Sequence, residues 1–200
     1  KVENDLLPFE FLVRSGRKDP MVTGGFNMSF RYKNMSIEGS SAFNLGQHKR
    51  LNNLYKSTQY VPAPDQNLSN ELTERWRKPG DETITDKPAF IKVNDFAASS
   101  VPLPTAAGTY VSLYDMYNQS DLRVANASFW RVRHIGFNYL FNPQLVQKWK
   151  LQQLQVGFQV YNPFILKSKV WQSQDPEQAN TGSIAQPITP SYNFILKVGI

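Results

Sequence analysis

Hydrophobic and polar residues alternate with a period of two along the last third of the chain. In the run that ends at Val160, one set of positions is apolar and the other is polar and uncharged. Successive side chains of a β-strand point to opposite faces of the sheet. The run therefore predicts a strand with one apolar and one polar face. The apolar set is Leu154, Val156, Phe158 and Val160, and the polar set includes Gln153, Gln155 and Gln159.

Other segments repeat this alternation. Residues 22–32 and 35–45 alternate and are separated by Lys33-Asn34, which predicts a β-hairpin whose turn can use the tolerance of Asn34 for positive φ. With 128–141, 151–162 and 190–200, they predict a sheet of about five to six strands. The apolar faces of the first and last strands comprise Phe26, Met28, Phe30, Tyr32, Tyr192, Phe194, Leu196, Val198 and Ile200.

The segment 128–141 changes phase near its middle. Trp130 and Val132 follow one phase of the alternation, whereas the apolar residues from Ile135 onward follow the other. One extra residue near Arg133-His134 would return both sets to a common face, so a β-bulge is predicted there.

Two long polar stretches, 46–127 and 163–189, separate the predicted strands, and within the first only 69–77 has a helical pattern. Stretches of this length argue against a compact soluble domain. They are typical of a transmembrane β-barrel with short periplasmic turns and long outer loops. The sequence thus predicts an all-β fold of antiparallel barrel strands. With a periplasmic C-terminus, both long stretches are extracellular. The apolar faces of the strands then meet lipid.

Composition changes this picture little. The 200 residues include 13% aromatic residues and no cysteine, which excludes thiol catalysis, thiolate metal ligands and disulfides. The net charge is +6, but the basic residues are scattered, so no nucleic-acid partner is predicted. The sequence contains no apolar run of about 18 residues, so no transmembrane helix is predicted. The start, Lys-Val-Glu, has no signal peptide, so we expect either a processed chain or an internal piece of a longer one.

Catalytic chemistry finds little support in the sequence. His48 and His134 lie far apart in the chain, and no serine-nucleophile elbow, HExxH or P-loop pattern is present. The acidic residues between Glu71 and Asp86 lack the usual calcium-loop spacing, and a solvated helix face followed by a turn accounts for them. No enzyme activity, cofactor or metal site is therefore predicted.

Candidate ligand contacts lie on the polar face and in the first long loop. The glutamine row of Gln153, Gln155 and Gln159 could bind sugar hydroxyls or peptide amides, but the favoured interpretation is a generic wet lumen or a plug contact. Arg131 and Arg133 could steer an anionic ligand, with ion pairs to a plug or to loops as the alternative. The loop aromatics could stack on a ligand or hold the loop together; they are Trp76, Tyr110, Tyr114 and Tyr117.

Four stretches, in this order, resemble the C-terminal part of the SusC/RagA family of TonB-dependent outer-membrane transporters. They are residues 23–34, 75–82, 120–132 and 190–200. The last residue departs from the family pattern, because family members usually end in an aromatic residue and this chain ends in Ile200.

The resemblance implies a component of an outer-membrane importer of glycan or peptide oligomers, energised by TonB and paired with a SusD-like surface lipoprotein. This chain would supply barrel wall, entry loops and the closing strand. Five or six strands span about 25–30 Å and cannot close a barrel of roughly 22 strands with a plug. We therefore expect the sheet to pair with the rest of a barrel and its plug, which the sequence does not include. Two alternatives stay open: a structural barrel subunit that does not import, and a soluble β-sandwich binding module.

Overall fold

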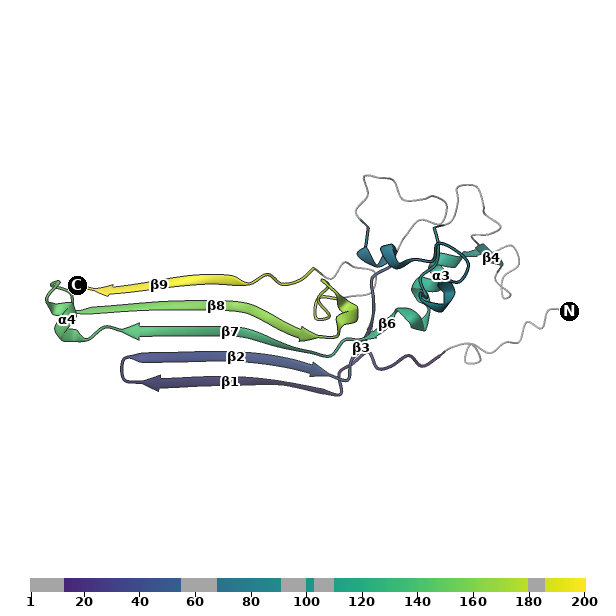
Figure 1. Ribbon diagram of the computed structural model, residues 1–200. Coiled ribbons are helices and arrows are strands. Elements are labelled where there is room, and N and C mark those ends of the chain that lie inside the picture. The colour runs from purple at the N-terminus through teal and green to yellow at the C-terminus, as the bar shows by residue number, and fades with distance from the viewer. Residues whose placement is uncertain (1–12, 55–67, 91–99, 103–109, 180–185) are drawn as a thin grey trace. The chain divides into compact units, whose positions relative to one another are not determined.

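The computed structural model describes residues 13–54, 68–90, 100–102, 110–179 and 186–200 (Figure 1). It divides into two units, which we call the sheet unit and the loop unit. The sheet unit comprises residues 17–49, 126–179 and 185–200, and the loop unit comprises residues 1–16, 50–125 and 180–184. Within the described ranges, no helix has the length and hydropathy needed to cross a membrane.

The sheet unit is built on one antiparallel sheet with the strand order β1-β2-β7-β8-β9 (Figure 1). The alternating segments of the sequence form these strands: the ends of β1 and β2 are as expected, and those of β7 and β9 differ from the expected ones by one residue. Their bounds are β1 (Val22–Tyr32), β2 (Met35–Leu45), β7 (Phe129–Leu140), β8 (Gln153–Lys167) and β9 (Ser191–Gly199).

The turn between β1 and β2 differs from the expectation in one respect. The residue with positive φ is Lys33, at 50°, rather than Asn34. Asn34 instead bonds to the next strand: its side-chain amide donates to the carbonyl of Leu140 at 2.7 Å, and the Leu140 amide donates to the carbonyl of Asn34 at 2.8 Å. These two hydrogen bonds attach the end of the hairpin to β7.

The predicted β-bulge is present at Arg133. Adjacent Ser40 and Ser41 of β2 pair with His134 and Val132, so Arg133 is the extra residue in β7. The facing strand β8 is irregular at the same level, because Asn162 has φ of 50° and precedes Pro163.

Strand β8 does not end at 162, as the alternation suggested, but continues to Lys167. Left-handed Asn162 and Pro163, which lacks an N–H, interrupt the sequence pattern without ending the strand. Beyond them Phe164 and Leu166 return to the apolar face, since they pair with Val132 and Trp130. The predicted loop 163–189 therefore begins five residues too early.

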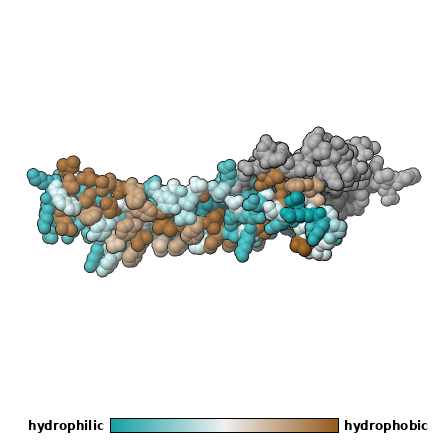
Figure 2. Space-filling view, turned by 45° about the horizontal axis from the view of Figure 1, so that its top comes forward, coloured by the Kyte–Doolittle hydropathy of each residue, from teal (hydrophilic) through white to brown (hydrophobic). Residues whose placement is uncertain are grey.

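The register gathers the apolar side chains on one face. Phe158 lies between Phe137 of β7 and Phe194 of β9, and its ring centroid is 4.9 Å from that of Phe194. Many of these side chains are open to the surroundings, among them Phe26 at 62% and Phe194 at 85% exposed. Figure 2 shows hydrophobic residues spread along the length of the sheet. No described element of the sheet unit forms a second layer over this face.

Buried hydrophobic residues of the sheet unit gather near the two ends of the sheet. At the end with the β1–β2 turn, Val146 of α4 (Pro143–Gln147) is buried, and the Asn142 side chain caps this helix. At the other end, Phe129 and Trp171 of η4 (Lys169–Trp171) are buried. The C-terminus lies at the same end of the sheet as α4 (Figure 1).

The loop unit is more structured than a predicted loop over 46–127 implies. The helical pattern at 69–77 forms only a short 3₁₀-helix, η1, whose N-cap is Ser69. The buried residues of the loop unit include Leu51, Leu54, Leu72, Tyr114 and Ala125. The elements are η1 (Asn70–Glu74), η2 (Asp81–Thr83), β4 (Ser100–Pro102) paired with β5 (Tyr110–Ser112), α3 (Leu113–Gln119) and η3 (Asp121–Arg123). Two short strands, β3 (His48–Arg50) and β6 (Val124–Asn126), occur where the chain passes between units.

A buried ion pair stabilises the loop unit. Arg123 donates to Glu71 at 2.6 Å, and both side chains are almost fully buried. The same guanidinium donates to the carbonyl of Asn52 and lies 5.7 Å from the ring centre of Tyr117. Because Glu71 belongs to η1 and Arg123 to η3, the pair joins these two elements. Removing one partner would leave a buried charge without compensation.

Candidate functional site

The glutamine row lies on the polar face of the sheet. Gln153 pairs with Gly199, Gln155 with Lys197 and Gln159 with Asn193, so all three share a face opposite the apolar one. Gln155 donates to the side-chain oxygen of Asn138 at 3.4 Å, and the Tyr161 hydroxyl donates to Gln159 at 3.1 Å. Gly157 leaves room for the Asn138 side chain, because a Cβ there would lie 2.5 Å from its oxygen. The row is thus an uncharged surface able to donate and accept hydrogen bonds.

The polar face also carries His134 beside the bulge. Its Nε2 lies 3.9 Å from Glu38, and its ring centre lies 4.8 Å from that of Tyr161. Such a pair lacks a nucleophile or a third orienting group within the described residues. No three histidine, cysteine or acidic side chains come together in those ranges to hold a metal ion.

The two candidate arginines of β7 are paired with acidic residues of the segment 168–179, which we call the anchored loop. Arg131 is 2% exposed; it donates from Nη2 to Asp175 and from Nε to Glu177 at 2.9 Å. Arg133 donates to the other oxygen of Glu177. Ion pairing with a loop, the alternative that the sequence left open, is the arrangement observed.

Three further contacts hold the anchored loop. The indole of Trp171 donates to the carbonyl of Asn126 at 2.8 Å, and Lys167 donates to the carbonyl of Gln174. Lys49 donates to the carbonyl of Pro176 at 2.8 Å. Burial lowers the pKa of Lys49, although the negative charges of Glu177 and Asp175 oppose that shift. The anchored loop is therefore a fixed part of the sheet unit.

The loop aromatics make contacts within the loop unit. Tyr114 is buried, and its hydroxyl donates to the carbonyls of Pro88 and Ala89 at 3.1 and 2.8 Å. Burial raises the pKa of Tyr117, which lies against Arg123. Trp76 donates from its indole to Glu82 at 2.9 Å. The side chain of Tyr110 lies outside the described residues. The described aromatics thus hold the loop unit together, and Trp76 and Tyr117 remain half-buried.

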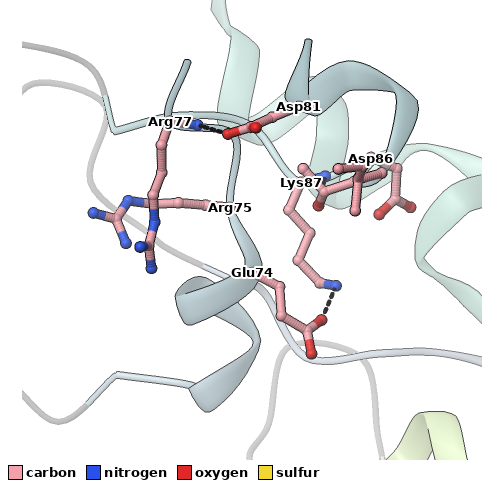
Figure 3. A pocket seen from close by; sticks show the side chains of 8 residues that line it. Glu74, Arg75, Arg77, Asp81, Asp86 and Lys87 are labelled. Carbon is pink, nitrogen blue, oxygen red and sulfur yellow. Dashed lines mark hydrogen bonds and ion pairs between the residues drawn. The ribbon is translucent and has the colours of Figure 1, made fainter. Parts of the chain in front are cut away.

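A pocket of about 450 Å³ opens in the loop unit between η1 and the segment after η2 (Figure 3). Lys87 donates to Glu74 at 2.7 Å across it. That hydrogen bond and the charge of Lys87 hold the pKa of Glu74 below its usual value. The pocket is lined by Glu74, Arg75, Arg77, Asp81, Ile84, Thr85, Asp86 and Lys87.

Sequence reasoning missed most of these partners. Asp175 and Glu177 lie in a polar loop more than forty positions from the arginines they bind, and no periodicity marks them. The Asp175-Pro176 dipeptide, which indicates a turn, was the available signal. Arg75 belongs to the stretch 75–82 that carries the resemblance, Asp81 also belongs to the acidic turn, and no sequence pattern marked Lys87.

Comparison with known protein families finds no matching family, and no curated protein matches the sequence. Among solved structures, the chain is similar to the RagAB peptide importer in its open-open state, with 20% identity and a TM-score of 0.57 over 90% of this chain and 17% of that one. A structure of the RagAB peptide transporter matches with 18% identity and a TM-score of 0.54, over 87% of this chain and 16% of that one. The closed-closed state gives 20% identity and a TM-score of 0.52, over 88% and 17%.

These likenesses establish the fold. The chain spans about a sixth of the length of the importer chains it matches. The expectation of an all-β, incomplete barrel sector similar to part of a RagA-type chain is confirmed. The structures it matches are transport proteins.

Proposed function

We propose that this chain forms part of the wall of a TonB-dependent outer-membrane importer for peptide or glycan oligomers. The observation that carries the proposal is a single sheet with one exposed apolar face and one polar face, in the fold of a peptide importer's chain. In a barrel wall the apolar face meets lipid and the polar face lines the lumen. The exposed apolar side chains, Phe26 to Tyr32 of β1 and Tyr192 to Ile200, then need no protein cover.

The two edge strands support the same proposal. β1 and β9 each pair with one neighbour in the described structure, so each has one edge of unpaired backbone groups. Such groups must find partners before a sheet can lie in lipid. Further strands of the same barrel are the partners we propose, and a plug would lie against the polar face.

The arrangement of the connections favours one orientation. The Lys33-Asn34 turn, α4 and the C-terminus lie at one end of the sheet (Figure 1), and we place that end in the periplasm. The long segments 46–128 and 168–190 then belong to the cell exterior, where a SusD-like lipoprotein would meet them. Contact with TonB would be made by another part of the transporter.

A pair of cysteine variants tests the lipid-facing assignment, because the chain has no cysteine of its own. Phe194→Cys lies on the apolar face and its neighbour Asn193→Cys on the polar face. In native membranes, a lipid-soluble maleimide should label the first, and a water-soluble one the second. Protection of Phe194→Cys from both reagents in a detergent-free soluble protein would favour the β-sandwich alternative and overturn the proposal.

Uptake measurements test import itself. Cells that make the complete transporter should accumulate labelled peptide or glycan oligomers, and should lose this uptake when the proton-motive force is dissipated or the gene is deleted. Equal uptake with and without the gene, for both classes of oligomer, would leave the structural barrel subunit as the better account.

A further inference from the structure

Arg75 and Arg77 lie close together on one side of the pocket in the loop unit (Figure 3). Arg75 donates to the carbonyl of Leu72 at 3.0 Å, and its guanidinium lies 4.4 Å from the ring centre of Phe90. Arg77 donates to the carbonyl of Thr73 at 2.6 Å. Each guanidinium is thus positioned by a backbone carbonyl of η1 and keeps further N–H donors for another group.

Two of the three carboxylates that line the pocket are hydrogen-bonded, and the third, Asp86, interacts electrostatically with Lys87. Glu74 accepts from Lys87, and Asp81 accepts from the backbone amides of Arg77 and Lys78 at 3.0 and 3.2 Å. In the part of the chain that the structure describes, neither Arg75 nor Arg77 has a carboxylate within ion-pair distance. Two neighbouring guanidinium groups that have no acidic partner among the described residues favour an anion supplied from outside.

We propose that Arg75 and Arg77 bind a carboxylate group of an oligomer that enters this pocket. The planar guanidinium matches a carboxylate through paired N–H donors. The exposed side chain of Ile84, also in the lining, offers an apolar contact for the rest of the ligand. An acidic peptide and a uronate-containing glycan carry the same group. The placement of this site on an import route rests on the proposed function, whereas the binding itself does not.

Isothermal titration of the complete complex in detergent tests this inference. The probes are triglutamate and trigalacturonate, with N-acetyl-trialanine amide and maltotriose as uncharged counterparts. The double variant Arg75→Gln/Arg77→Gln should weaken binding of the acidic probe about 10–100-fold, as expected for loss of hydrogen bonds to a charged group. Lys78→Gln removes a neighbouring positive charge that does not line the pocket and should leave binding unchanged.

The outcomes distinguish a peptide from a glycan as the source of the carboxylate, and they distinguish binding in the pocket from the proposed import function. Whichever acidic probe binds identifies peptide or glycan as the source of the carboxylate. Binding by neither acidic probe, equal binding of uncharged probes, or equal losses in the double variant and Lys78→Gln would each overturn the inference. Binding that depends on both arginines, in a complex whose cells take up no oligomer, would support the pocket and count against the import function.

Discussion

The chain contains two Arg-X-Arg sequences whose arginines have different kinds of partner in the structure. Arg131-Val132-Arg133 lies at the bulge of β7, and its two arginines share Glu177 while Arg131 also binds buried Asp175. Arg75-Trp76-Arg77 lies in the loop unit, where the arginines are bonded to backbone carbonyls. The first pair has its counter-charges within the chain, and in the described structure the second does not.

This difference shows why a pair of arginines in a sequence does not define a binding site. A guanidinium buried with two carboxylates is part of the folded structure, because its donors are already used. A guanidinium that is oriented by a carbonyl and only half-buried keeps its charge and its remaining donors for a ligand. Burial and partners therefore assign a structural role to Arg131 and a binding role to Arg75.

The largest expected effect is on Arg131. Arg131→Met leaves Asp175 buried without its partner, which typically costs about 3–5 kcal/mol of unfolding free energy. Urea unfolding of the complex in detergent, followed by tryptophan fluorescence, measures the loss. The matched variant Arg75→Met should lose far less, and equal losses would contradict the contrast between the two sequences.

Glu177→Gln should have an intermediate effect. It removes the negative charge that Arg131 and Arg133 share, but Asp175 still neutralises Arg131, and Glu177 is partly exposed at 24%. We expect a loss of about 1–3 kcal/mol, as for a hydrogen bond to a charged group. The same unfolding measurement applies, and a loss as large as that of Arg131→Met would mean that Glu177, not Asp175, is the main partner.

Smaller still is the expected effect of the double variant Arg75→Met/Arg77→Met on stability. Neither side chain makes an ion pair in the described structure; Arg77 is exposed, and Arg75 is half-buried against Phe90, so we expect a loss of about 1 kcal/mol or less. Unchanged limited proteolysis of the loop unit would agree with this. New cleavage sites near η1 would show that the arginines help to hold the loop unit together.

The smallest effect concerns pH. The hydrogen bond from Lys87, and then its charge, lowers the pKa of Glu74. This contribution to stability is present above the usual pKa of a glutamate and is lost as pH falls through the lowered value. Glu74 is exposed, so the effect is small. Protection of the amides near Lys87 from hydrogen exchange, relative to the intrinsic rate at each pH, should fall between pH 6 and 3 in the unaltered chain, whereas in Glu74→Gln it should stay the same.

Most of the sheet could be predicted from the sequence, because alternation reports directly which side chains share a face. Even the bulge at Arg133 followed from a change of phase. The prediction went wrong where backbone conformation, not hydropathy, decided the outcome. Asn162 with positive φ and Pro163 interrupt the pattern inside β8, and Lys33 rather than Asn34 takes the left-handed position in the first turn.

The candidate site was less predictable than the sheet. Its contacts join residues distant in the chain, such as Arg131 with Asp175 and Arg123 with Glu71. No periodic signal specifies which acid meets which base across a long loop. The sequence could identify Arg131, Trp76 and Tyr114 as notable, but only coordinates revealed that each is occupied within the chain.

The strand order has a consequence for how fast the sheet can assemble. β1 and β2 are joined by two residues, so their hairpin can close within microseconds. The neighbouring β2–β7 ladder joins segments separated by residues 46–128, and closing so long a loop carries a larger entropic cost. We expect two preformed hairpins, β1–β2 and β7–β8, to meet late, with the β2–β7 seam as the slow step. Until that seam forms, the free edge of β2 is the place where the nascent sheet is most open to pairing with a wrong strand.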